Sequence, residues 1–435
     1  MAAKKITYIG GGATRAPGTI ASFIHQGANF TGSEIVLYDI NAERLALVLK
    51  LAQKMAREQG VDIRFSATTD LSEALTDSQY VLTSYRPGGF EARMLDEKIP
   101  LKHGVIGQET QGPGGFMMAM RTIHVMKKIV KTMEKRSAKD VVLVNYTNPI
   151  NIVSQAVTRN TDIKTISMCE GSIESPKWYA AAVGLDPEKL THTMVGLNHG
   201  SWTIEHQWDG QDLIPLMADH YEKNRARWDN DLVGGGLIKL AIAMRALPNH
   251  YLQYYYLRDT WLDILKQKKT SRAQDILAKV PDYWAHYREQ LETKEISSLD
   301  PSRSRGGIHE LELAIDLMDA LMNDRKERLP VNVPNNGAIA NFDDDIIVEV
   351  PALVDASGVK PLRCGRMPAQ VMPLLHSLAE YQSLAADAAW SGNRKDAIVA
   401  LTANPLVGDF NKAEKLFDEM SHALKPYLPR RLLKG

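Results

Sequence analysis

The first 170 residues alternate short apolar runs with longer segments of helical periodicity. The apolar runs predict strands at 6–9, 34–39, 63–67, 80–85, 141–145 and 163–168. The segments between them predict helices at about 17–26, 43–59, 70–75, 116–135 and 151–159. This alternation is typical of a parallel sheet with helices on both faces. We therefore expect an α/β fold that begins with a Rossmann-like, doubly wound parallel sheet in residues 1–172.

The pattern changes in the second half of the chain. Residues 203–208 alternate and lead into a turn at Asp209-Gly210, a tight turn is expected at 335–341, and a strand at 346–350. Helical periodicity dominates the rest, and long helices are expected across 367–424. We expect residues 173–435 to form a mostly helical α+β domain that binds substrate and supplies an oligomer interface.

The composition excludes several classes of protein. Lys and Arg number 52 and are balanced by 52 Asp and Glu, so a nucleic-acid or anionic-membrane partner is not expected. The 2 cysteines are too few for a disulfide framework in a chain of 435 residues. The sequence starts directly with a strand, without the apolar segment of a signal peptide, and no run is long enough to span a bilayer. These features predict a cytoplasmic protein.

The turn after the first strand is a candidate nucleotide site. It reads Gly10-Gly-Gly12-Ala13-Thr14-Arg15, and such glycines let the backbone approach a pyrophosphate at a helix N-terminus. Arg15 replaces the third small residue of the usual Gly-x-Gly-x-x-Gly pattern. The prediction of a nucleotide site therefore also depends on Asp39, the acid that ends the second predicted strand. An acid there suits the ribose hydroxyls of NAD and repels the 2′-phosphate of NADP. The alternative is an ordinary strand-turn-helix with a solvated Asp39.

The segment from residue 86 to residue 115 has seven glycines and three prolines interspersed with charges. Long irregular segments inside compact domains are usually functional, so we expect an irregular functional loop here. A solvated surface loop is the alternative.

Two short polar segments carry candidate metal ligands. Cys169 follows a predicted strand, at the edge where open α/β sheets bind ligands, and His199 lies in Gly196-Leu-Asn-His199-Gly200. A thiolate and an imidazole would form a soft, two-ligand site with open positions, and these ligand types permit zinc, cobalt or nickel. Taken alone, Cys169 is more often a buried, inert thiol, because a free cysteine behaves as a small hydrophobic residue. Asn148 precedes a proline, which favours an extended backbone and would aim its amide out of the strand end.

Taken together, these motifs carry a family resemblance. They are Gly10-Gly-Gly12, Asp96-Glu97-x-Ile-Pro, Gly107-Gln-Glu-Thr-x-Gly-Pro-Gly-Gly115, Asn145-Tyr-x-Asn148-Pro149, Cys169, Gly196-Leu-Asn-His199, Pro248-Asn-x-Tyr251-Leu-Gln-Tyr-Tyr and Asn335-Asn-Gly-Ala-Ile-Ala-Asn-Phe342. Over nearly its whole length the chain resembles the NAD- and divalent-metal-dependent glycosidases of glycoside hydrolase family 4. The segments from Pro248 and Asn335 most resemble the 6-phospho-α-glucosidase branch.

The resemblance implies a chemistry that differs from that of most glycosidases, which use two carboxylates. The sugar is oxidised at C3, loses its C2 proton, eliminates the C1 substituent, adds water and is reduced again, so NAD is not consumed. The implied cofactors are NAD and a divalent metal, most often Mn²⁺. The implied partners are a small phospho-sugar substrate and further copies of the chain, as a homodimer or homotetramer.

Residue roles follow from the same resemblance, position by position. Cys169 and His199 match metal ligands, Tyr251 matches the base that removes the C2 proton, and Glu170 stands at the position of the acid. The predicted substrate-binding residues are Arg93, Asn148 for the sugar hydroxyls and Arg272 for the 6-phosphate. The predicted NAD-binding residues are Gly10, Gly12, Ala13, Thr14, Asp39, Arg86 and Asn145.

Three departures from the family pattern affect specificity. Glu170 stands where the α-specific branch has Asp and the β-specific branch has Asn, and Ser172 stands where Pro is expected. Ala13 replaces a Ser that is often found near the phosphate. An α-linked 6-phospho-glucoside is favoured, and a 6-phospho-β-glucoside or an unphosphorylated glycoside is the alternative. An NAD-dependent dehydrogenase of the lactate/malate type and a catalytically silent NAD-binding module are the alternatives from other classes.

Overall fold

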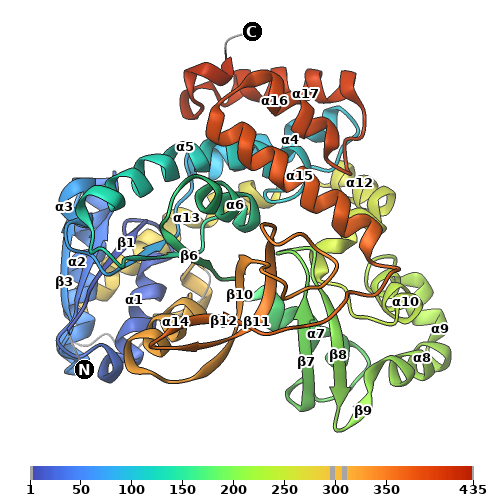
Figure 1. Ribbon diagram of the computed structural model, residues 1–435, viewed down its shortest axis with the longest axis horizontal. Coiled ribbons are helices and arrows are strands. Elements are labelled where there is room, and N and C mark those ends of the chain that lie inside the picture. Colours follow the sequence, from blue (N-terminus) through green and yellow to red (C-terminus); the bar gives the residue numbers. More distant parts are fainter. Residues whose placement is uncertain (1–2, 294–298, 306–310, 434–435) are drawn as a thin grey trace.

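A nine-stranded sheet forms the centre of the protein in the computed structural model, which describes residues 3–293, 299–305 and 311–433 (Figure 1). The order of its strands is β12-β11-β10-β6-β5-β4-β1-β2-β3. The strands from the first half of the chain are β1 (Lys5–Ile9), β2 (Glu34–Tyr38), β3 (Arg64–Thr68), β4 (Tyr80–Thr83), β5 (Val142–Asn145) and β6 (Lys164–Ser167).

Strands β1 to β6 are parallel and follow the order of a doubly wound dinucleotide-binding fold. Their apolar runs are buried because helices cover both faces. In the first half of the chain these are α1 (Ala16–His25), α2 (Ala42–Gln59), α3 (Leu71–Leu75), α4 (Gly89–Lys102), α5 (Gly112–Arg136), α6 (Ile150–Asn160) and α7 (Gly171–Ala182). The predicted α/β fold class is confirmed.

Three antiparallel strands from the second half extend the same sheet. They are β10 (Glu327–Pro334), β11 (Ile347–Asp355) and β12 (Gly358–Pro361). Strand β10 joins β6 through Asn332 opposite Ser167, and β11 pairs with β10 along its whole length. The second half of the chain therefore lies directly against the end of β6. The division into two domains at residue 172 stays a prediction.

The expectation of an irregular segment at 86–115 is wrong in its main feature. Residues 89–102 form α4, and α5 begins at Gly112 rather than at residue 116. The glycines permit close packing at helix starts. Gly88 precedes α4 with a φ of 83°, and a Cβ on Gly115 would lie 2.3 Å from the Thr110 carbonyl oxygen.

The rest of the second half is mostly helical, as expected. A three-stranded antiparallel sheet contains β7 (Leu190–Val195), β8 (Trp202–Trp208) and β9 (Gln211–Asp212), with the predicted turn at Asp209-Gly210 between β8 and β9. The remaining helices are α8 (Leu213–Lys223), α9 (Arg225–Asn230), α10 (Gly234–Met244), α11 (Gln253–Tyr256), α12 (Arg258–Gln267), α13 (Arg272–Glu292), α14 (Glu312–Asn323), α15 (Met372–Ser391), α16 (Arg394–Ala403) and α17 (Phe410–Ala423).

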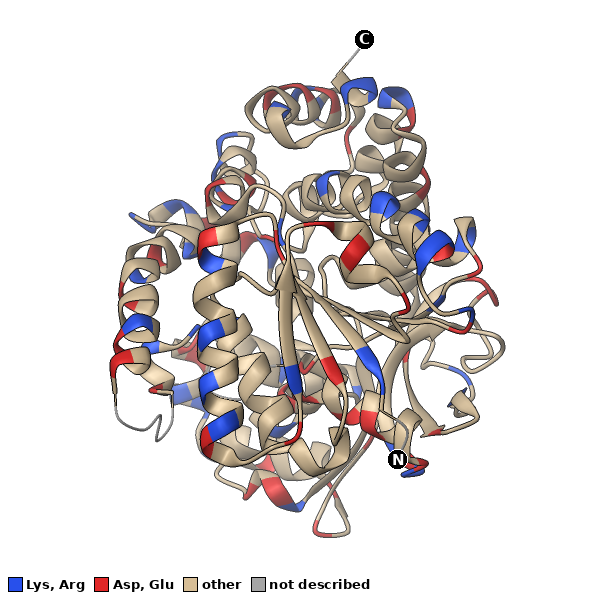
Figure 2. Cartoon of the chain, turned by 90° about the vertical axis from the view of Figure 1, so that its left-hand side faces the viewer, with Lys and Arg blue, Asp and Glu red and all other residues tan. Residues whose placement is uncertain are grey.

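The outer elements form two groups (Figure 1). Helix α15 packs on α5 and α6 and continues into α16 and α17, while β7–β9 and α8–α10 gather at another corner of the molecule. Acidic and basic residues are interspersed along the chain, in keeping with the balanced composition (Figure 2). Among the described helices, none combines the length and the apolar character needed to cross a membrane.

Candidate active site

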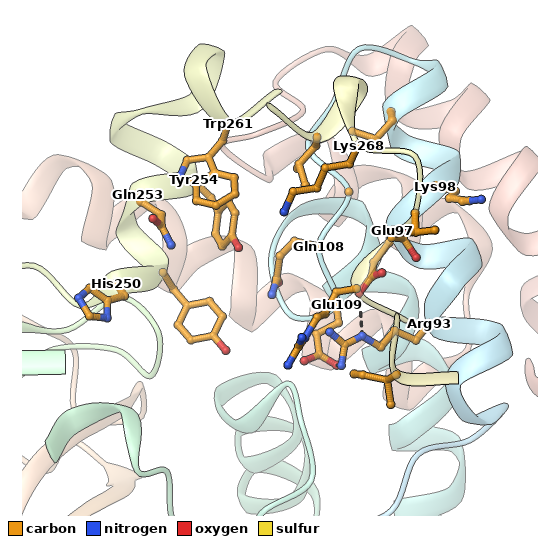
Figure 3. Close-up of a pocket in the computed structure, with 18 of the residues that line it drawn as sticks. Arg93, Glu97, Lys98, Gln108, Glu109, His250, Gln253, Tyr254, Trp261 and Lys268 are labelled. Carbon is orange, nitrogen blue, oxygen red and sulfur yellow. Dashed lines mark hydrogen bonds and ion pairs between the residues drawn. The ribbon is translucent and has the colours of Figure 1, made fainter. Parts of the chain in front are cut away.

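A cavity of about 490 Å³ lies between α4, the segment 107–109, the residues around α11 and α12, and the start of α13. Figure 3 shows the aromatic side chains of Tyr254 and Trp261 on one side and Arg93 and Glu109 on the other. Tyr251 and Arg272 also line the cavity. Three of the predicted catalytic or substrate-binding residues, Arg93, Tyr251 and Arg272, therefore share one cavity.

Arginine and glutamate side chains form a connected network in the wall of this cavity. Arg86 Nη2 and Arg93 Nη1 lie 2.7 Å and 2.8 Å from the same Glu109 oxygen. Arg93 Nε also donates to Glu97 at 2.7 Å. Burial works to raise the pKa of Glu109, but the surrounding arginines outweigh it and lower that pKa to about 2. The wall therefore presents fixed, ionised groups at neutral pH.

Glu97 connects this network to the start of α13. Its second carboxylate oxygen accepts a hydrogen bond of 2.8 Å from the backbone N–H of Ala273, the residue after Arg272. Arg272 is the first residue of α13, and its side chain is exposed at the cavity. Glu97 thus contacts Arg93 directly and holds the start of α13, where Arg272 lies.

Cys169, His199 and Tyr251 come together beside the cavity. The Cys169 Sγ lies 3.7 Å from His199 Nε2. The rings of His199 and Tyr251 stack with centroids 3.7 Å apart and planes inclined by 8°. Cys169 follows β6, His199 has a φ of 60° in the loop between β7 and β8, and Tyr251 lies in the 3-10 helix His250–Leu252. The fold therefore brings three separate elements into contact: the end of β6, the loop between β7 and β8, and the 3-10 helix.

Polar groups contact Nδ1 of His199, on the side of the ring away from Cys169. Thr110 Oγ1 lies 3.2 Å from Nδ1 and donates to Gln108 Oε1 at 2.9 Å, so it can accept a hydrogen bond from a protonated Nδ1. Gln111 Nε2 donates to the same Thr110 hydroxyl at 3.3 Å, and Tyr255 donates to Gln111 Oε1 at 2.7 Å. With the proton on Nδ1, the Nε2 lone pair is directed at Cys169.

Burial keeps the three groups in their neutral forms. It raises the pKa of the Cys169 thiol to about 12, with Glu349 as a second cause, and lowers the pKa of His199 to about 4. Burial, with Glu109 as the next cause, also raises the pKa of Tyr251 well above its usual range. In the chain alone, the site therefore presents a thiol, a neutral imidazole and a phenol at neutral pH.

The Cys169–His199 pair fits a divalent cation. For zinc, for example, bonds of about 2.3 Å to sulfur and about 2.1 Å to nitrogen at a tetrahedral angle place the two atoms about 3.6 Å apart. The observed separation is 3.7 Å. In the described part of the chain, no third Cys, His, Asp or Glu joins them in a metal-binding cluster. A cation held there would keep open positions for substrate oxygens.

The N-terminal turn fits a dinucleotide. Gly10 has a φ of 105°, and a Cβ on it would lie 2.2 Å from the Ser84 carbonyl oxygen. The N–H of Gly12 donates to Asp39 Oδ2 at 3.1 Å, so the turn and the acid at the end of β2 are held together. Helix α1 begins directly after the turn, as a pyrophosphate site requires. Ala13 is half-buried, whereas Thr14 is buried.

Two of the predicted NAD-binding residues use their polar atoms within the chain. Asn145 is fully buried; its Oδ1 accepts from Thr83 Oγ1, and its Nδ2 donates to Ser167 Oγ and to the Thr147 carbonyl oxygen. Arg86 pairs with Glu109. Asn145 thus ties together the ends of β4, β5 and β6. The structure places Asn145 and Arg86 near the predicted site but engages them with other residues.

Two further predicted residues lie near Cys169 or the end of β5. Glu170 is exposed, and its Oε1 accepts a hydrogen bond of 2.8 Å from the Tyr146 hydroxyl. The Oδ1 of Asn148 is buried and has no hydrogen-bond partner among the described residues. An unpaired buried acceptor of this kind suits a ligand hydroxyl.

Sequence reasoning missed several residues that shape the site. Thr110, Gln108 and Glu97 lie in motifs that the sequence singled out, but their roles depend on contacts with distant segments. Glu349 also escaped notice, although it is the one charged residue in the apolar run Ile346–Val354. An acid at such a position is a signal that could have been used.

Comparisons with known proteins agree over nearly the whole chain. Residues 5–185 match the model of the family 4 glycosyl hydrolases, and residues 194–407 match the model of the family 4 glycosyl hydrolase C-terminal domain. A probable 6-phospho-beta-glucosidase of Bacillus subtilis (strain 168) is 33% identical over 444 residues, covering 98% of this chain and 97% of the relative.

Two solved structures are also similar. A 6-phospho-alpha-glucosidase from gut microorganisms, in complex with NAD and glucose-6-phosphate, has a TM-score of 0.85 and 29% identity over 99% of each chain. The 6-phospho-beta glucosidase of Thermotoga maritima, with manganese, NAD+ and glucose-6-phosphate, has a TM-score of 0.82 and 26% identity over 98% of this chain and 99% of its own.

Proposed function

The chain belongs to glycosyl hydrolase family 4, and on that premise we propose that it cleaves 6-phospho-glucosides with the help of NAD and Mn²⁺. The observation that carries this proposal is the meeting of Cys169, His199 and Tyr251 beside an arginine-lined cavity. The similar structures contain NAD and glucose-6-phosphate, and one also contains manganese. The α-linked substrate is favoured because Glu170 can act as an acid.

Bound NAD would accept and return a hydride at C3 of the sugar, and a divalent cation would supply Lewis acidity beside it. Cys169 and His199 would hold the cation, and Gly10, Gly12, Ala13, Thr14 and Asp39 would hold the dinucleotide. Asn145 would support the cofactor site indirectly, through its hydrogen bonds to the ends of β4 and β6. Arg86 would support it through its ion pair with Glu109. The chain's own task is to place C2 and C3 of the sugar beside Tyr251.

Tyr251 is the proposed base for the C2 proton. Oxidation at C3 makes this proton acidic, and a cation near the Tyr251 hydroxyl would favour the phenolate, offsetting the effect of burial. Stacking on His199 restricts the orientation of the phenol ring. Loss of the C2 proton then drives cleavage of the bond between C1 and the leaving oxygen.

Glu170 is the proposed acid for the leaving oxygen. The Tyr146 hydroxyl holds its carboxyl group at the edge of the site, next to Cys169 in the chain. Cleavage leaves a double bond between C1 and C2, to which water adds before C3 is reduced. Arg272 and Arg93 would bind the 6-phosphate and the sugar, since a guanidinium matches phosphate geometry, while Asn148 Oδ1 would accept from a sugar hydroxyl.

The test is hydrolysis of paired p-nitrophenyl α- and β-glucoside 6-phosphates with and without NAD and Mn²⁺. We expect α-selective release that requires both cofactors and is lost in Cys169→Ser. β-Selective release would keep the mechanism but change the role of Glu170. Activity on unphosphorylated glycosides alone would overturn the phosphate assignment, and net formation of NADH would indicate a dehydrogenase.

The cytoplasmic location and the homodimer or homotetramer remain part of the proposal. Phosphorylated sugars and NAD are intracellular metabolites, which supports the location. Light scattering coupled to size-exclusion chromatography measures the number of chains directly, and a monomeric mass would contradict the proposed assembly.

A further inference from the structure

Glu349 is a buried acid that has no cationic partner among the residues that the structure describes. It lies in β11, and its side chain is 1% exposed. Within the ranges that the structure describes, Lys, Arg and His form no ion pair with it; the equally buried Asp96 and Glu97, in contrast, are paired with Arg121 and Arg93. Placing a carboxylate in such surroundings is costly unless another positive charge is supplied.

Neutral donors surround the Glu349 carboxylate. Ser201 Oγ donates at 2.7 Å and Asn198 Nδ2 at 3.2 Å, while Asn332 Nδ2 lies 3.5 Å away. Donors of this kind stabilise the ionised form but leave its charge uncompensated. The Glu349 carboxyl group is therefore either protonated and neutral, or ionised and compensated by a cation that binds nearby.

The same carboxylate is attached to the loop that carries His199. Glu349 and Gly196 exchange two backbone hydrogen bonds, of 3.0 Å and 2.7 Å, at the start of this loop. Asn198 precedes His199, and Ser201 lies two residues after it, so both side-chain donors belong to the loop. The loop is thus held to β11 by backbone and side-chain bonds on both sides of His199.

Glu349 is also connected to the strand that leads to Cys169. Asn332 Nδ2 lies 3.5 Å from the Glu349 carboxylate and donates at 3.3 Å to the carbonyl oxygen of Ser167, two residues before Cys169. A buried negative charge favours a nearby divalent cation.

We propose that Glu349 is the buried counter-charge of the divalent cation held by Cys169 and His199, and that it positions His199 through Asn198 and Ser201. This inference rests on the proposed function, since it requires the cation to bind there. A cation with two positive charges would then face one thiolate and one carboxylate inside the protein. Outer groups of this kind commonly change metal affinity about 10- to 100-fold.

The experiment is a titration of the metal-free full chain with Mn²⁺ alone, followed by the electron paramagnetic resonance signal of free Mn²⁺. Glu349→Gln keeps the shape of the side chain and removes its charge, and we expect Mn²⁺ binding about 10- to 100-fold weaker than in the wild type. NAD binding and the circular dichroism spectrum should be unchanged. Unchanged Mn²⁺ affinity in folded Glu349→Gln would overturn the proposal and leave Glu349 with a structural role.

Asp355→Asn is the matched control. It removes another buried carboxylate from β11, about 20 Å along the strand and paired with Lys360. We expect its Mn²⁺ affinity to stay within about twofold of the wild type; an equal loss would show that removing any buried charge from this strand is sufficient.

A second pair of variants covers the case in which Glu349→Gln does not fold. Glu349→Asp and Glu349→Asn have side chains of the same length and differ only in charge, so tighter Mn²⁺ binding by the Asp variant supports the proposal and equal binding overturns it. Wild type and Cys169→Ser separate this inference from the proposed function. If the wild type binds no Mn²⁺, or if Cys169→Ser binds it equally well, the metal site itself is wrong and the inference falls with it.

Discussion

Tyr251 is the residue whose chemistry depends most on its surroundings. Its phenol is stacked on His199 and lines the cavity, but burial raises its pKa. Such a group can act as a base only when a nearby positive charge favours the phenolate. The stacking of this tyrosine on the histidine proposed to bind the metal is therefore a chemical arrangement as well as a packing contact.

Tyr251→Phe tests this role at the scale of one oxygen atom. We expect a loss of turnover of about 10²- to 10⁴-fold, the usual contribution of a positioned acid or base. Binding of NAD and Mn²⁺ should persist, because the ring still fills the same space. Retained exchange of the C2 proton with solvent would place the base elsewhere, and Tyr254→Phe is the matched control on the neighbouring ring.

Single residues were predictable where they lie in a recognisable sequence motif. Cys169, His199 and Tyr251 were predicted from short motifs and a family resemblance, and they lie together. Thr110 could not be assigned in this way, because its role comes from a hydrogen bond to a histidine 89 residues away. The interactions that orient a predicted ligand are set by the fold, which sequence spacing does not reveal.

Helix α4 is an element that the sequence pattern did not predict. A surface helix is usually recognised by its apolar face, but the buried side of α4 carries Arg93, Asp96 and Glu97. These charges are buried because their partners come from α5, α13 and the segment at Glu109. The charged pattern therefore resembled a loop, although it belongs to a helix that supports the cavity.

Glu97→Gln tests the connection between α4 and α13. The change weakens the contact with Arg93 and the cap on Ala273, so we expect KM for 6-phospho-glucosides to rise about 10-fold, with a smaller change in kcat. Steady-state kinetics measures both constants. Glu91→Gln, an exposed position on the same helix, is the control. An equal rise in KM for unphosphorylated glycosides would contradict a role in phosphate binding.

The whole molecule is organised by a sheet that both halves of the chain share. The six parallel strands were predictable because their apolar runs alternate with helical segments. The addition of β10–β12 was not, since β10 meets β6 through residues 165 positions apart in the chain. This antiparallel extension places Glu349 behind the loop of His199, and so connects the overall topology to the candidate metal site.

Asp96→Asn tests the stability of the assembled molecule. Both oxygens of Asp96 accept from Arg121, at 2.9 Å and 2.6 Å, and both side chains are fully buried between α4 and α5. Removal of one charge leaves the other without compensation, so we expect the free energy of unfolding to fall by about 3–5 kcal/mol. Denaturant titration measures the loss. A loss below about 1 kcal/mol would show that the pair adds little to stability.

The central claim is that the glycosidic bond breaks by oxidation and elimination, with Tyr251 removing the C2 proton. The most direct measurement is hydrolysis of a p-nitrophenyl glucoside 6-phosphate in D₂O with NAD and Mn²⁺, followed by NMR of the released sugar phosphate. The account predicts deuterium at C2 in the wild type and none in Tyr251→Phe. Rapid hydrolysis by the wild type without deuterium at C2 would contradict it.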